Sequence, residues 1–135
     1  MPKPAGSLTS IQHEIMGVVW DSGAEGATVT EIWRTIAKQR QVGRTTILNL
    51  VARLVERHWL VRRDRRRPSH YLAALSREET AAALAGGFVE DFFDGSASNL
   101  VMSLLGSKRL KRDEIEHLRR ALDSISKQPD AKKGG

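Results

Sequence analysis

The stretch that decides the fold is GRTTILNLVARLVERHWLVRRDRRRPSHYLAAL, residues 43–75. It opens with an amphipathic helix whose apolar positions recur at helical spacing, at Ile47, Leu50, Val51, Leu54 and Val55. Two short strands, 59–61 and 71–73, follow and are joined by an arginine-rich turn. A helix that begins with a cation and hydroxyls, beside a cationic hairpin, predicts binding to the grooves of duplex DNA.

Two shorter helices precede this stretch. The pairs Thr9–Gln12 and Thr28–Glu31 have the spacing of capping boxes, in which each side chain satisfies the other residue's backbone N–H. The resulting order of helix, helix, helix and hairpin is that of a winged helix-turn-helix. We therefore expect a winged-helix DNA-binding domain over residues 8–75, after a flexible terminus at 1–7.

The second half of the chain is predicted to be helical. A third capping box, Ser76–Glu79, starts a long helix, and the glycines at 86 and 87 predict a kink or weak point in it. Three short helices in about 50 residues bury too little surface alone, and a second copy of the chain is the simplest partner. The fold class is mainly α with a small β-hairpin, with a helical dimerisation domain at 76–127 and a flexible tail at 128–135.

The predicted dimer interface consists of apolar residues at helical spacing, including a coiled-coil-like seam in the last helix. Its members are Phe88, Phe92, Leu100, Val101, Leu104, Leu105, Ile115, Leu118, Leu122 and Ile125.

The charge is concentrated in the first half of the chain. The net charge is +6, and residues 1–75 hold 12 Lys/Arg against 6 Asp/Glu, whereas residues 76–127 hold 8 against 9. A basic half joined to a near-neutral half favours an acidic partner. The sequence has no signal peptide and no apolar segment long enough to span a bilayer, so we expect a cytoplasmic protein without membrane insertion.

No pattern calls for a metal, a cofactor or catalysis. The four histidines, His13, His58, His70 and His117, lack zinc-ligand spacing, and the absence of cysteine excludes disulfides and thiolate sites. The sequence contains no phosphate-binding glycine loop and no GxSxG motif. We predict a protein that is not an enzyme.

Four segments in order resemble the penicillinase-repressor family, over roughly residues 8–125. LTSIQHEIMGVVW (8–20) resembles the family's opening helix, and TVTEIW (28–33) its second helix. TTILNLVARLVERHWL (45–60) resembles its recognition helix and following strand, and FFDGSASNLVMSLL (92–105) its dimerisation segment. The resemblance implies dimeric repressors that bind DNA dyads in front of resistance or transport genes.

In some members a membrane metalloprotease sensor, or an activity that it triggers, cuts the dimerisation domain and inactivates the repressor. The family's Asn-Phe cleavage pair aligns with Ser103 and Leu104, so the candidate cleavage site is there but the same protease specificity is not implied. Copper-responsive relatives carry a cysteine cluster, which this sequence lacks.

The candidate DNA-binding residues lie at the first helical turns of the recognition helix, in the arginine turn and at the start of the second helix. They are Arg44, Thr45, Thr46, Asn49, Arg53, Arg63, Arg65, Arg66, Arg67 and Thr28. Residues near the start of a recognition helix reach base edges, and flanking arginines reach phosphates. The alignment with the family favours Thr45, Thr46, Asn49 and Arg53, while capping alone explains Thr28 equally well.

The sequence thus predicts a dimeric transcriptional repressor that binds double-stranded operator DNA and is released by an inducing signal. One alternative is a winged-helix regulator that senses a small-molecule inducer in its second half. The other is a winged-helix protein-interaction module that binds no DNA.

Overall fold

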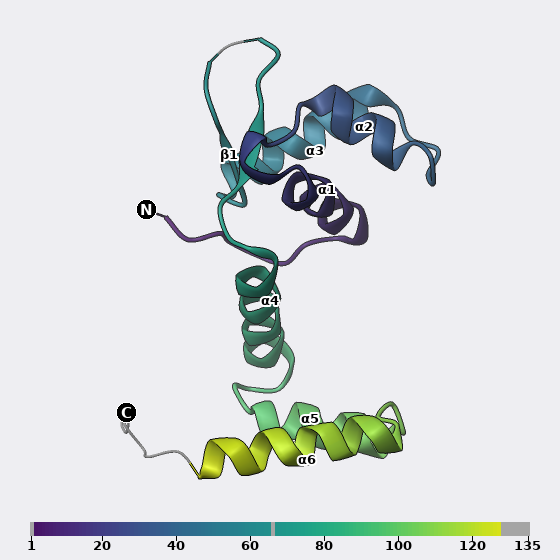
Figure 1. Ribbon diagram of the computed structural model, residues 1–135, viewed down its shortest axis with the longest axis vertical. Helices are drawn as coiled ribbons and strands as arrows, with labels where there is room; N and C mark the ends of the chain where they lie inside the picture. The colour runs from purple at the N-terminus through teal and green to yellow at the C-terminus, as the bar shows by residue number, and fades with distance from the viewer. Residues whose placement is uncertain (1, 66, 128–135) are drawn as a thin grey trace. The chain divides into compact units, whose positions relative to one another are not determined.

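The computed structural model describes residues 2–65 and 67–127 (Figure 1). The predicted DNA contact Arg66 and the predicted tail 128–135 lie outside the described residues. The elements in chain order are α1 (Ser10–Asp21), the 3-10 helix η1 (Gly23–Glu25), α2 (Val29–Ile36), α3 (Arg44–Glu56), β1 (Leu60–Arg62), β2 (Tyr71–Ala73), α4 (Arg77–Phe92), α5 (Ala97–Gly106) and α6 (Arg112–Ser126).

This element order confirms the predicted fold class, a winged helix followed by a helical segment. The chain separates into two compact units, Met1–Phe88 and Val89–Gly135. Their boundary falls inside α4, because the first turns of that helix pack on the winged helix. Gly86 and Gly87, where a kink or weak point was predicted, lie inside α4 and do not divide it into two helices.

The first unit has a hydrophobic core built where α1, α2, α3 and the hairpin meet. Its buried members are Ile15, Met16, Val19, Ala27, Val29, Ile32, Ile36, Ile47, Val51, Leu54, Trp59 and Leu60. The apolar stripe predicted for α3 supplies three of them, and its other two members, Leu50 and Val55, pack against the same core while partly exposed. Burial of this stripe turns the polar face of α3 outward.

The three predicted capping boxes are present. The Glu31 carboxylate accepts the Thr28 backbone N–H at 2.9 Å, and the Thr28 hydroxyl accepts the Glu31 N–H at 3.1 Å. Thr9 with Gln12 and Ser76 with Glu79 make the same reciprocal pairs at 2.8–3.3 Å. Each pair satisfies backbone donors at the start of a helix, which sets where α1, α2 and α4 begin.

Each of the three tryptophans ties a connecting segment to the first unit. The indole N–H donates to a backbone carbonyl in every case: Trp20 to Leu75 at 2.9 Å, Trp33 to Val42 at 2.9 Å and Trp59 to Ala5 at 3.0 Å. The rings supply apolar contact while the N–H finds a partner. The segments fixed in this way lead into α4, join α2 to α3, and precede α1.

The N-terminal arm makes further contacts with the end of α3. The Ala5 N–H donates to the Arg57 carbonyl at 3.1 Å, and the Arg57 guanidinium donates back to the carbonyls of Ala5 and Ser7. These bonds join the terminus that was predicted to be flexible to residues about fifty positions further along the chain.

The wing is an antiparallel hairpin in which Leu60 pairs with Ala73 and Arg62 with Tyr71. A short third segment joins it, because Ala27 and Tyr71 exchange backbone hydrogen bonds of 3.1 and 2.8 Å. Gly26 has a φ of 76°, and a Cβ there would lie 2.3 Å from the Tyr71 carbonyl oxygen. Glycine at this position therefore lets the loop before α2 approach the wing.

The second unit contrasts with the first in burial. Residues 89–127 are all described, and none of them is buried. Large apolar side chains of α5 and α6 lie in solvent, at Val101, Met102, Leu105, Leu118, Leu122 and Ile125. Within the described part of the chain, no helix is both long enough and apolar enough to cross a membrane.

Candidate nucleic-acid interface

The outward face of α3 carries the residues that the sequence predicts to read DNA. Arg44, Thr45, Thr46, Asn49 and Arg53 are all exposed. The last three recur at intervals of three and four residues, which places them on one face of the helix. The structure thus brings Thr46, Asn49 and Arg53 together on one polar face of α3, whereas Arg44 lies with Leu48 beside the start of α2.

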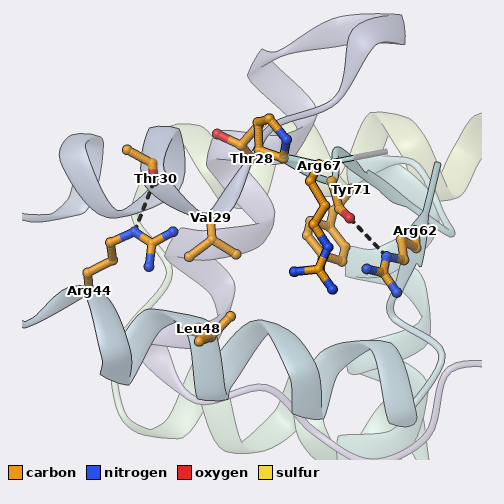
Figure 2. Close-up of a pocket in the computed structure, with 10 residues that line it drawn as sticks. Thr28, Val29, Thr30, Arg44, Leu48, Arg62, Arg67 and Tyr71 are labelled. Carbon is orange, nitrogen blue, oxygen red and sulfur yellow. Dashed lines mark hydrogen bonds between the residues drawn. The ribbon is translucent and has the colours of Figure 1, made fainter. Parts of the chain in front are cut away.

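An open hollow of about 360 Å³ lies between the start of α2, the start of α3 and the wing (Figure 2). Its lining comes from three elements that are distant in sequence: Thr28, Val29 and Thr30, then Arg44 and Leu48, then Arg62, Arg67, Pro68, Ser69 and Tyr71. No carboxylate is among these residues. Three guanidinium groups around one hollow, without a local anion, create a positive site that suits a phosphate.

Hydrogen bonds hold two of these arginines in place. The Nε of Arg44 donates to the Thr30 hydroxyl at 2.9 Å, and the Nε of Arg62 donates to the Ser69 hydroxyl at 3.0 Å. In each pair the acceptor is a neutral hydroxyl, so the hydrogen bond holds the guanidinium without a negative charge to balance it. Figure 2 shows Arg44 on one side of the hollow and Arg62 with Arg67 on the other.

Thr28 and Thr30 have different roles in this hollow. Thr28 is 7% exposed, and its hydroxyl and N–H are both used in the capping box with Glu31. The predicted contact Thr28 is therefore a capping residue that lines the hollow. Thr30, two positions further on, is partly exposed and holds Arg44. The sequence signal for this role of Thr30 is a hydroxyl residue in the first turn of a helix.

The arginines of the turn differ in whether they form an ion pair within the protein. Arg63 makes a 2.9 Å ion pair with the Glu25 carboxylate and also donates to the Glu25 carbonyl at 3.0 Å. Its charge is thus partly balanced within the protein. Arg65 and Arg67 are exposed, and Arg67 lines the hollow. Arg62, the first residue of the arginine run 62–67, completes the cationic lining.

Among the residues that the structure describes, no group of three or more His, Asp or Glu side chains is arranged to hold a metal ion. The site consists of guanidinium, hydroxyl and amide groups, which form hydrogen bonds to phosphates and base edges. It offers a binding surface, and its groups are those that recognise nucleic acid.

A winged helix with an exposed polar recognition helix, followed by a helical segment, defines the class of winged-helix DNA-binding proteins. The sequence profile of the penicillinase repressors matches residues 8–124, and the chain belongs to that family. It is 25% identical over 120 residues to the penicillinase repressor of Staphylococcus aureus, covering 89% of this chain and 94% of that relative. Members of the family are DNA-binding regulators rather than enzymes, and this chain is a transcriptional repressor.

Proposed function

We propose that this repressor acts as a dimer that binds an operator dyad, with one winged helix on each half-site. The observation that carries the proposal is the continuous surface formed by the polar face of α3 and the arginine-lined hollow beside it. A helix in the major groove with a cationic flank on the backbone fits this surface.

We propose two kinds of DNA contact on the basis of the positions of the side chains. Thr45, Thr46 and Asn49 lie near the start of α3 and are proposed to contact base edges. Arg44, Arg62 and Arg67 surround the hollow and are proposed to hold a backbone phosphate. Arg53, two turns further along α3, is proposed to contact a neighbouring phosphate.

The second unit is proposed to couple two copies of the chain. Leu122 and Ile125 are each 65% exposed and Met102 is 63% exposed, although all three are large apolar residues. Residues 89–127 bury no side chain within the single chain, so their apolar faces need another surface. A second copy supplies an identical apolar face, and symmetric dimers are the commonest solution.

Release is proposed to occur by separating the two winged-helix domains of the dimer, each of which we call a reading head. Ser103 and Leu104 lie inside α5, where their carbonyls accept backbone hydrogen bonds of 3.0 Å from Ser107 and Arg109. A protease requires extended backbone, so cutting here needs local unfolding of the last turn of α5. Dividing the chain at this bond would remove α6 and much of the exposed apolar surface from the reading head.

The regulated genes and the signal belong to the same proposal. The S. aureus relative is named for repression of a penicillinase. We propose that this chain represses resistance, stress or transport genes. A membrane protease sensor acting on α5 and a small-molecule inducer are the two routes of release. A ligand-dependent rise in melting temperature without cleavage would identify the second route.

Gel-shift titration with DNA from the protein's own promoter region tests DNA binding. Because each subunit is proposed to neutralise several phosphates, the slope of log affinity against log salt should be on the order of −5 or steeper for a dimer. Arg44→Ala should make the slope shallower by about one per subunit. Arg120→Ala on α6 removes the same charge outside the reading head and should leave the slope unchanged. The absence of any shift would favour the protein-interaction module.

A further inference from the structure

The first half of α4 is fixed to the winged helix by contacts from the end of α1. The Trp20 indole N–H donates to the Leu75 carbonyl, immediately before the helix. Arg77, the first residue of α4, lies with its guanidinium carbon 5.0 Å from the centre of the Trp20 ring and pairs with Asp21 at 3.2 Å. These contacts attach the start of α4 to the end of α1.

Two further side chains continue this attachment along α4. Thr80 is 1% exposed, and Leu84 packs against the hydrophobic core of the winged helix. The contact boundary between the two units follows at Phe88–Val89. The helix thus leaves its support between Leu84 and Val89, and that interval contains Gly86 and Gly87.

Neither glycine is required by the local geometry. Among the residues that the structure describes, no atom other than those of the adjacent residues and the helix's own nearby backbone lies within 4 Å of a Cβ built at Gly86 or Gly87, and neither glycine has a positive φ. Their remaining effect is energetic, because glycine is the poorest helix former after proline. Two adjacent glycines weaken α4 at the point where the winged helix ceases to support it.

We infer that Gly86–Gly87 is a hinge within α4 that sets which operator half-site spacings the repressor accepts. In the duplex, one added base pair moves a half-site by about 3.4 Å and rotates it by about 35°. A dimer with stiff arms fits one spacing, whereas bending at the glycine pair lets each reading head follow the displaced half-site. This effect on the accepted operator spacings rests on the proposed function, in which the repressor binds the operator as a dimer.

The hinge is tested first without DNA, by distance distributions between spin labels. The chain has no cysteine, so Lys38→Cys on the exposed end of the α2 region and Arg120→Cys on α6 give two defined label positions. Labelled chains are diluted with unlabelled protein to suppress distances between copies. We expect a broad distribution in the parent chain and a distribution at least twofold narrower in Gly86→Ala/Gly87→Ala.

Gly17→Ala is the matched control. Gly17 lies inside α1 and also has open space around its Cβ position, so the substitution strengthens a helix in the same way but within the winged helix. It should leave the width of the distribution unchanged. Equal widths for the parent and the double alanine variant would overturn the hinge, whatever DNA does.

The effect on operator spacing is tested on synthetic dyads. Their half-sites are first identified by footprinting, and the spacer between them is then lengthened or shortened by one base pair. The parent chain and Gly17→Ala should lose less than about tenfold in affinity on the altered spacers. Gly86→Ala/Gly87→Ala should keep its affinity for the best spacer within twofold and lose at least tenfold more than the parent on the others. A narrowed distance distribution with an unchanged spacing profile would overturn the role in operator selection. Failure of the parent chain to bind any dyad would instead refute the proposed function.

Discussion

The two units of this chain differ in how much of their apolar surface they bury. Residues 8–75 place twelve apolar side chains in a common core, so that Ile15, Ile32 and Leu54 are 0% exposed. Residues 89–127 bury none, and Leu122 and Ile125 remain 65% exposed on α6. The first unit is stabilised by its own contacts, whereas the second leaves apolar surface exposed, and this difference is why we propose that the second unit binds another copy of the chain.

The largest expected effect comes from placing a charge on the exposed apolar face. Leu122→Asp should prevent association, because a carboxylate loses its hydration in an apolar interface. Affinity for an operator dyad should then fall by about 10²-fold or more, since the second head no longer binds at high effective concentration. Gel-shift titration on the dyad and on a single half-site measures this loss. Equal losses on both DNAs would show that the substitution damages the reading head itself.

A matched pair of leucine substitutions sharpens the comparison between the units. Leu54→Ala removes side-chain atoms from the fully buried core and should lower the free energy of unfolding by about 2–5 kcal/mol. Leu122→Ala makes the same chemical change on the exposed face. Its effect should grow with protein concentration, because it acts through association. Thermal unfolding at several concentrations checks both. A concentration-independent loss for Leu122→Ala would place that residue in a core of the single chain.

Within the reading head, substitutions at base contacts and at phosphate contacts should have different effects on DNA binding. Thr46→Ala and Asn49→Ala should each reduce the preference for operator over random DNA by about 1 kcal/mol or more. Arg67→Ala should weaken both DNAs to a similar extent, since a phosphate contact carries no sequence information. Competition titrations with the two DNAs measure the preference. The opposite pattern would exchange the roles of α3 and the wing.

The smallest effect concerns an exposed ion pair that links α1 to the segment after α2. The Arg40 guanidinium, which donates to the Glu14 carboxylate, lowers the pKa of Glu14 below its usual value of 4.5. A lowered pKa means that the pair stabilises the folded state above that value and is lost as the pH falls through the folded-state pKa. Glu14→Gln should therefore be slightly less stable than the parent at pH 7, and the difference should disappear as the pH falls below the folded-state pKa of Glu14. Urea unfolding over a series of falling pH values checks this, and a difference that persists at the lowest pH would point to lost packing instead.

Much of the winged helix could be predicted from the sequence because its signals are local. Capping boxes such as Thr28–Glu31 and the apolar stripe of α3 depend on residues three or four positions apart. The exposed positions of Thr45, Thr46 and Asn49 follow directly from that stripe. The start of β1 was predicted one residue early, because Trp59 has strand propensity but packs into the core just before the strand.

What could not be predicted depends on contacts between distant segments. Arg63 is paired with Glu25, 38 residues earlier, and Ala27 pairs with Tyr71 across the loop before α2. The hollow requires α2, α3 and the wing to meet, so the hydrogen bonds of Arg44 to Thr30 and of Arg62 to Ser69 became visible only in the folded chain. The hydrogen bond from the Trp59 indole N–H to the Ala5 carbonyl was not predicted for the same reason, because it also joins distant segments.

In the proposed dimer, the second unit couples two winged helices on one operator. Sedimentation equilibrium of the full chain, alone at micromolar concentration and with an operator dyad mapped by footprinting, measures this coupling. We expect a particle of about twice the 15.0 kDa chain mass and two chains on each duplex. A monomer in solution that binds the dyad as a single chain would contradict it.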